Sequence, residues 1–118
     1  MPDAVIAERL EYIRESIQLI ESRTQAILSS KDFIKTEESK MIMDAVAMRL
    51  QVIGENVKKI SRLQPGFFEE HLNFDIDPII RFRDFVAHHY EKTDYEIIFD
   101  ICKNHIPKLK TAIAEILK

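Results

Sequence analysis

Two long stretches of this sequence repeat apolar residues at alternating steps of three and four, the spacing of one face of an α-helix. The first stretch predicts a long N-terminal helix whose apolar stripe consists of Ile6, Leu10, Ile13, Ile17, Ile20 and Ile27. Polar Thr24 occupies the one remaining position of this stripe. The second predicts another long helix: Met43, Val46, Leu50, Ile53, Val57 and Ile60. The polar residues 29–32 break the pattern between them. We therefore expect an antiparallel helical hairpin.

Shorter helices are predicted in the rest of the chain. Asp77 before Pro78 marks a helix start, and Thr93 with Asp94 marks another. Pro107 must kink or restart the last helix. Only two glycines and four prolines among 118 residues leave few turn residues for a sheet. We expect an all-α fold, an up-and-down bundle of four to five helices with a long N-terminal helical hairpin and a kinked C-terminal helix.

The second long helix has two features outside its stripe. Gly54 in mid-helix costs about 1 kcal/mol relative to alanine, so we expect a close approach there, most simply for helix packing. Met41, Met48 and Val52 predict that this helix also contacts a third element. Glu55 could reach a cleft or could be a solvated helix charge, and we leave it out of the catalytic set.

Size, charge and cysteine content narrow the class of protein. The length predicts a single domain, residues 1–118, near the size at which pairing with a second copy helps bury apolar surface. A net charge of −3 argues against a broad nucleic-acid-binding surface, so any RNA contact must be local. The single Cys102 and the lack of a leader or an apolar run predict a cytoplasmic protein away from membranes. Without a metal-ligand motif, we expect neither metal nor cofactor.

Residues 81–90 form the densest group of chemically active side chains: Arg81, Arg83, Asp84, His88, His89 and Tyr90. Arginine matches phosphate oxygens with a fixed fork of donors, and histidine can take and give a proton near neutral pH. Together they could cut RNA without a metal. On one helix, however, Arg83 and His88 would lie about 140° apart. Either the helix ends before His88 and the chain turns back, or the site is assembled from two copies across a twofold interface.

Helical spacing pairs these side chains in two ways. Asp84 and His88 share a face at i and i+4, so the carboxylate could orient the imidazole and favour its protonated form. Arg81 lies on the side of His88, whereas Arg83 is aligned with Tyr90. In a purely structural alternative, His88 and His89 complement the carbonyl groups at a helix C-terminus, and Arg83 pairs with a surface carboxylate. Spacing alone favours this structural alternative.

The pattern of Arg83-Asp84, three residues, and then His88-His89-Tyr90 resembles the motif of HEPN-superfamily ribonucleases, and its final tyrosine is similar to the HepT-like toxins. The segment 50–56 resembles the Gly-Glu segment in the second long helix of that family. The order of elements is similar over essentially the whole chain. In two differences, residues 74–77 lack the usual Trp, and Asp84 stands where Asn is more common. Neither difference removes a catalytic group.

The resemblance implies a metal-independent endoribonuclease that acts as a homodimer, with both motifs facing one cleft. Arg83 would hold the scissile phosphate and His88 would act as general base or acid, supported by Asp84, Arg81 and His89. The RNA 2′-hydroxyl would attack, so a cyclic phosphate would form and DNA would be spared.

The resemblance also implies a toxin–antitoxin pair. An MntA-like nucleotidyltransferase antitoxin would AMPylate Tyr90 and block the cleft. Two other functions stay open. One is a non-catalytic HEPN-like binding module that docks a nucleotidyltransferase or a nucleotide, and the other is a plain dimeric helical adaptor.

Overall fold

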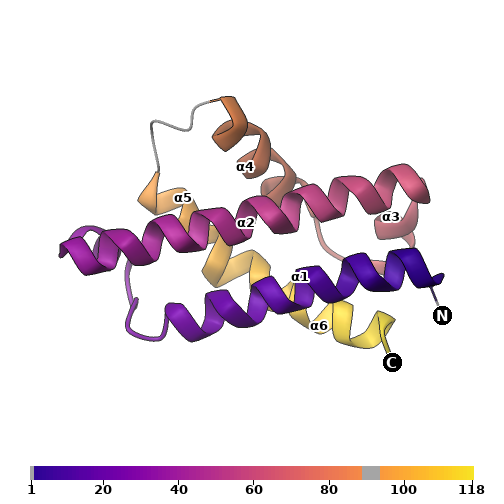
Figure 1. Ribbon diagram of the computed structural model, residues 1–118, viewed down its shortest axis with the longest axis horizontal. Coiled ribbons are helices and arrows are strands. Elements are labelled where there is room, and N and C mark those ends of the chain that lie inside the picture. Colours follow the sequence, from indigo (N-terminus) through magenta and orange to yellow (C-terminus); the bar gives the residue numbers. More distant parts are fainter. Residues whose placement is uncertain (1, 89–93) are drawn as a thin grey trace.

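The computed structural model describes residues 2–88 and 94–118, and for residues 85–88 it describes the backbone path alone. Over these residues the fold is all-α, without a strand, as predicted (Figure 1). The α-helices are α1 (Ala4–Arg23), α2 (Glu37–Leu63), α3 (Phe67–His71), α4 (Asp77–His88), α5 (Tyr95–Asp100) and α6 (Ile106–Ile116). A 3₁₀ turn (Ser30–Ile34) precedes α2, and a π-helical turn (Ile101–His105) joins α5 to α6.

The long helices α1 and α2 lie side by side and run in opposite directions (Figure 1). Their buried faces are the two predicted stripes, apart from Ile27. Asp3 caps α1 by accepting the N–H of Ile6 at 2.9 Å. The helix ends at Arg23, about one turn earlier than the stripe predicts, where the Thr24 hydroxyl donates to the carbonyl oxygen of Ile20. Ile27 is therefore half-buried in the connection that follows.

The connection between α1 and α2 is organised around one carboxylate. Asp32 accepts the N–H groups of Leu28 at 2.8 Å and of Ser29 at 3.0 Å, and it pairs with Lys35 at 2.6 Å. The Lys35 ammonium and the two N–H groups lower the pKa of Asp32 from 3.8 to about 2. The next residue, Phe33, is fully buried and fixes the connection to the core.

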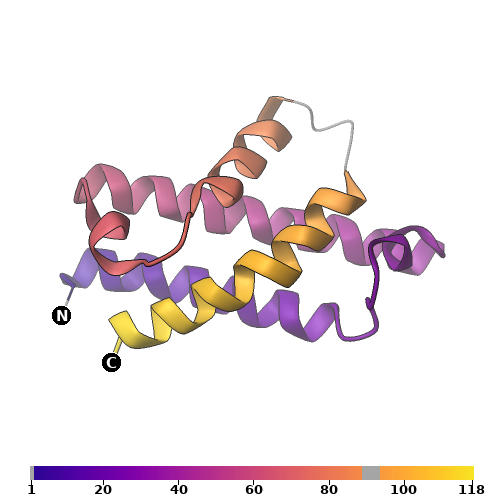
Figure 2. The ribbon, with the colours of Figure 1, turned by 180° about the vertical axis from the view of Figure 1, so that it is seen from behind.

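The remaining helices cover the hairpin. α4 packs on α2, and the rod formed by α5, the π-helical turn and α6 runs diagonally across the hairpin (Figure 2). Asp94 caps α5 by accepting the N–H groups of Glu96 and Ile97, as predicted. The predicted interruption at Pro107 is also confirmed, because the N–H of Ile106 donates to the carbonyl oxygen of Ile101, five residues earlier. Thr93 lies outside the described residues.

One continuous apolar core joins these elements. Besides the two stripes it contains Phe33, Phe67, Phe68, Ile79, Phe82, Ile98, Ile101, Ile106, Leu109 and Ile113. The prediction that the second long helix also contacts a third element is confirmed, but Met41 and Met48 do not make that contact, since their side chains are 70% and 52% exposed. The third element that packs on α2 is α4, and it approaches at Gly54. Among the described helices, none has the length and apolar character needed to cross a membrane.

Candidate functional site

Arg83 lies where α4 crosses α2, directly over Gly54. A Cβ atom at position 54 would lie 2.6 Å from the Cβ and 3.0 Å from the Cγ of Arg83. It would also lie 3.4 Å from the carbonyl oxygen of Ile79. Carbon atoms do not approach each other to 2.6 Å, so a larger residue at position 54 would push the two helices apart. The close approach predicted at Gly54 is confirmed, and its neighbour is the arginine of the sequence motif.

Four charged side chains meet at this crossing, and we call them the Arg83 cluster: Glu55 and Lys58 of α2, with Arg83 and Asp84 of α4. The Arg83 guanidinium donates to Glu55 Oε1 at 3.2 Å and to Asp84 Oδ1 at 3.3 Å. The Lys58 ammonium donates to the same Asp84 oxygen at 2.7 Å. The cluster is thus a chain of alternating charges, with Asp84 held between two cations.

Arg83 stays charged, and both cations of the cluster reach solvent. The hydrogen bond to Glu55, with a smaller contribution from Asp84, raises the pKa of Arg83 against the effect of burial. Lys58, followed by Arg83, lowers the pKa of Asp84. The side chains of Arg83 and Lys58 are 28% and 30% exposed. Ion pairs at such a surface contribute little, so a phosphate can replace a carboxylate as the partner of Arg83.

His88 is the last residue of α4, and the helix is continuous from Arg83 to this position. The possibility that the helix ends before His88 is therefore wrong. Five helical residues rotate the chain by about 140°, so positions 83 and 88 lie on different sides of the α4 backbone. The second possibility from the sequence, a site completed by another copy, stays a prediction.

Of the remaining predicted site residues, the structure describes the side chains of some and not of others. Arg81 is exposed and has no ion-pair partner within the described part of the chain. Asp84 binds Lys58 and Arg83, whereas its predicted pairing with His88 involves a side chain outside the description. His89 and Tyr90 also lie outside the described residues. The ion pair of Arg83 with Glu55 agrees with the structural alternative, in which Arg83 pairs with a surface carboxylate. It is also compatible with phosphate binding, because both side chains reach solvent.

The sequence interpretation missed two members of the cluster. The sequence gives Glu55 no catalytic role, yet its carboxylate accepts a hydrogen bond from Arg83. Lys58 was not singled out at all. The usable signal was Gly54, because the residues one and four places after a glycine that accepts a crossing helix lie beside that crossing.

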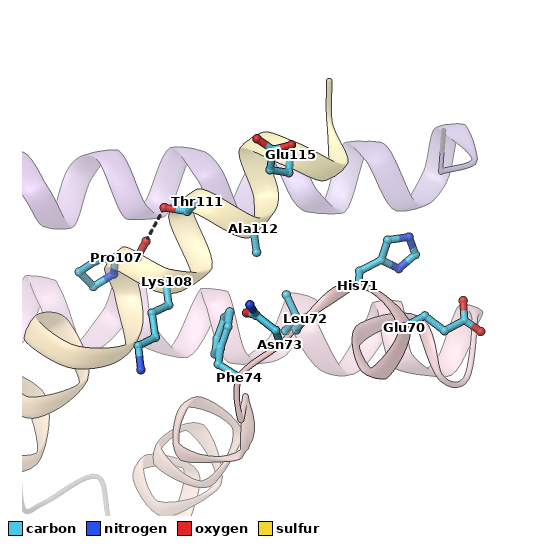
Figure 3. A pocket seen from close by; sticks show the side chains of 10 residues that line it. All are labelled: Glu70, His71, Leu72, Asn73, Phe74, Pro107, Lys108, Thr111, Ala112 and Glu115. Atoms are coloured by element: carbon cyan, nitrogen blue, oxygen red, sulfur yellow. Dashed lines mark hydrogen bonds between the residues drawn. The ribbon is translucent and has the colours of Figure 1, made fainter.

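A groove with a volume of about 660 Å³ lies elsewhere, between the segment 70–74 and one face of α6 (Figure 3). Its polar lining carries both signs of charge, with Glu70 and Glu115 against Lys108. Of the predicted site residues whose side chains the structure describes, Arg81, Arg83 and Asp84, none lines it. In the described ranges, no group of three or more His, Cys, Asp or Glu side chains could hold a metal ion.

Comparison with known families gives one match over most of the chain. The sequence profile described as "Ribonuclease HepT-like" matches residues 13–116. This range contains the whole Arg83 cluster and the motif from Arg83 to Tyr90. No solved structure matches the chain.

Three relatives give the same indication. A candidate RNase of Caldanaerobacter subterraneus is 30% identical, with 92% of this chain matched to 91% of that protein. A protein of Thermococcus cleftensis named "probable ribonuclease HepT" is 32% identical, with 92% of this chain matched to 93% of it. A longer protein of Methanocaldococcus jannaschii, named as a gamma-glutamylcyclotransferase and candidate RNase, is 34% identical over 92% of this chain. The chain spans only 46% of that longer protein.

Proposed function

Because the chain belongs to the HepT-like ribonuclease family, we propose that it is a metal-independent endoribonuclease in which Arg83 binds the scissile phosphate and His88 transfers the proton. The observation that carries this proposal is the position of Arg83. Its guanidinium is charged, partly exposed and fixed over Gly54 by the helix crossing, and its partners are carboxylates that a phosphate can displace.

The reaction follows from these two groups. A neutral His88 imidazole takes the proton of the RNA 2′-hydroxyl, and the oxygen attacks the adjacent phosphorus. Arg83 stabilises the negative charge that develops on the phosphate oxygens. The bond to the 5′-oxygen breaks, and a protonated imidazole returns a proton to that leaving group. The products are a 2′,3′-cyclic phosphate and a 5′-hydroxyl, and DNA is not cut because it lacks the attacking group.

A homodimer supplies what one copy lacks. Positions 83 and 88 lie about 140° apart around the α4 backbone, so a twofold partner can place its own His88 beside Arg83.

The proposed biological role is that of a cytoplasmic toxin paired with an MntA-like nucleotidyltransferase antitoxin. Tyr90 follows the proposed proton-transfer residue by two positions. Transfer of AMP to its hydroxyl would add a phosphate charge and an adenosine beside the RNA site. Mass spectrometry of protein produced with that partner should find AMP-sized additions on the Tyr90 peptide. An unmodified Tyr90 would remove the regulatory proposal and leave the nuclease proposal standing.

Cleavage of RNA in the presence of EDTA tests the nuclease proposal. We expect Arg83→Ala and His88→Ala each to lower the rate by about 100-fold or more, and to relieve the growth defect caused by expression without the antitoxin. Arg62→Ala, which removes an exposed arginine from α2, should leave both unchanged. Wild-type protein that neither cuts RNA nor slows growth would favour the non-catalytic binding module.

A further inference from the structure

We propose that Lys58 is a second phosphate-binding residue of this site, and that Asp84 holds Lys58 and Arg83 side by side so that both contact the RNA backbone. This inference rests on the proposed function, because it assigns a further contact for the same substrate. Lys58 lies outside the motif from Arg83 to Tyr90 and belongs to a different helix.

The shared acceptor carries the geometric argument. The Lys58 ammonium and one Arg83 amino group bond the same oxygen atom, Asp84 Oδ1, at 2.7 Å and 3.3 Å. Two donors that share one acceptor are close neighbours, so they can reach the oxygens of one phosphate or of two consecutive phosphates. Lys58 lies one helical turn after Gly54, on the side of α2 that α4 crosses.

The balance of charges in the Arg83 cluster also favours phosphate binding. One Asp84 carboxylate serves two cations, so this trio has an excess positive charge. Glu55 balances that charge through a single bond to Arg83, and its side chain is 51% exposed. An incoming phosphate therefore needs to displace only this exposed carboxylate to find two cations already in place. In a protein of net charge −3, such a local pair is what RNA binding requires.

The salt dependence of RNA affinity measures whether Lys58 contacts a phosphate. The probe is a fluorescein-labelled, fully 2′-O-methylated oligoribonucleotide of mixed sequence, which cannot be cleaved through 2′-hydroxyl attack. Its affinity is measured by anisotropy over a KCl series for wild type, Lys58→Met, Lys58→Gln and Lys58→Arg. Lys59→Met is the matched control, because it removes the same charge from the next residue of α2, about 100° around the helix. Thermal melting verifies that each variant is folded.

We expect Lys58→Met and Lys58→Gln to weaken binding about five- to tenfold, and to reduce the slope of log K against log salt by about 0.7, the value of one lost contact to a single strand. Lys58→Arg and Lys59→Met should keep the wild-type slope. The double variant Lys58→Met/Asp84→Asn separates direct contact from neutralisation of Asp84. If Lys58 touches phosphate, the slope of the double variant stays reduced.

The outcomes separate the two proposals. Wild-type slope and affinity in the double variant would show that Lys58 only neutralises Asp84, and would overturn this inference. An unchanged slope in both Lys58→Met and Lys58→Gln would do the same, while RNA binding and cleavage by wild type would leave the proposed function intact. A wild type that neither binds the probe nor cuts unmodified RNA would overturn both.

Discussion

At the scale of single residues, the guanidinium of Arg83 has two carboxylate partners, and a phosphate must compete with them. Asp84 is shared with Lys58, so its charge is already balanced. Glu55 has Arg83 as its ion-pair partner and is the more exposed of the two carboxylates. In the proposed function, Glu55 therefore restrains Arg83 in the unbound protein and is the group that the RNA phosphate would displace.

Replacing Glu55 tests this restraint. Glu55→Gln removes a negative charge beside the phosphate site but keeps an amide oxygen that can accept from Arg83. We expect KM for RNA to fall about two- to fivefold with little change in kcat, since the interaction that is lost opposes binding. Glu69→Gln removes an equal charge from α3 and should leave KM unchanged. A lower kcat with an unchanged or higher KM would instead show that Glu55 orients Arg83 for the reaction.

At the scale of elements, the crossing of α4 over α2 depends on the missing side chain of Gly54. Alanine is the better helix former by about 1 kcal/mol, so an uncrowded glycine in mid-helix would gain stability on replacement. Here the added carbon would meet the Cβ of Arg83, a rigid part of that side chain, at 2.6 Å. The cost of crowding exceeds the gain in propensity.

Gly54→Ala should therefore lower the free energy of unfolding by about 1–2 kcal/mol, the net of the crowding cost and the helix gain. It should also slow RNA cleavage, because Arg83 moves with α4. Denaturant unfolding and a cleavage assay measure the two effects. Ser61→Ala on the same helix is the control, with an expected change below about 0.5 kcal/mol. A Gly54→Ala protein that is more stable than wild type would contradict the close approach.

The connection between α1 and α2 should open in acid. Asp32 has a pKa lowered from 3.8 to about 2, so its contribution to stability is complete above its ordinary value and is lost as pH falls toward about 2. We expect the amide protons of Leu28 and Ser29 to lose protection between pH 4 and pH 2, as measured by hydrogen exchange. In Asp32→Asn this pH dependence should disappear. Protection that persists down to pH 2 would contradict the assignment.

The sequence predicts features within one helix better than contacts between helices. The buried faces of α1 and α2 followed from periodicity, because spacing within one helix determines which side chains share a side. The end of α1 was misjudged, since Thr24 satisfies a carbonyl group and stops a stripe that seemed to reach Ile27. The Arg83 cluster could not be derived, because it joins residues 26 and 28 positions apart and depends on where two helices cross. Gly54 predicts the close approach of another helix, but a glycine does not indicate which side chain of that helix will contact it.

At the scale of the whole molecule, the residues proposed for phosphate binding and proton transfer occupy positions on different sides of the same helix. α4 runs without a break from Arg83 to His88, so the separation of about 140° is built into its backbone. The family shown by the sequence comparison consists of ribonucleases, and the proposed reaction needs both groups at one phosphate. In the proposed function, a second copy related by a twofold axis resolves this conflict.

Mixing two inactive variants tests this central claim most directly. Copies with Arg83→Ala and copies with His88→Ala, carrying different affinity tags, are co-expressed, and the mixed dimer is purified and assayed on RNA with EDTA. The mixed dimer contains one complete pair, with Arg83 from one copy and His88 from the other, so we expect about half of the wild-type rate. Each parent dimer should stay about 100-fold or more below wild type. A mixed dimer no more active than its parents would contradict the shared site.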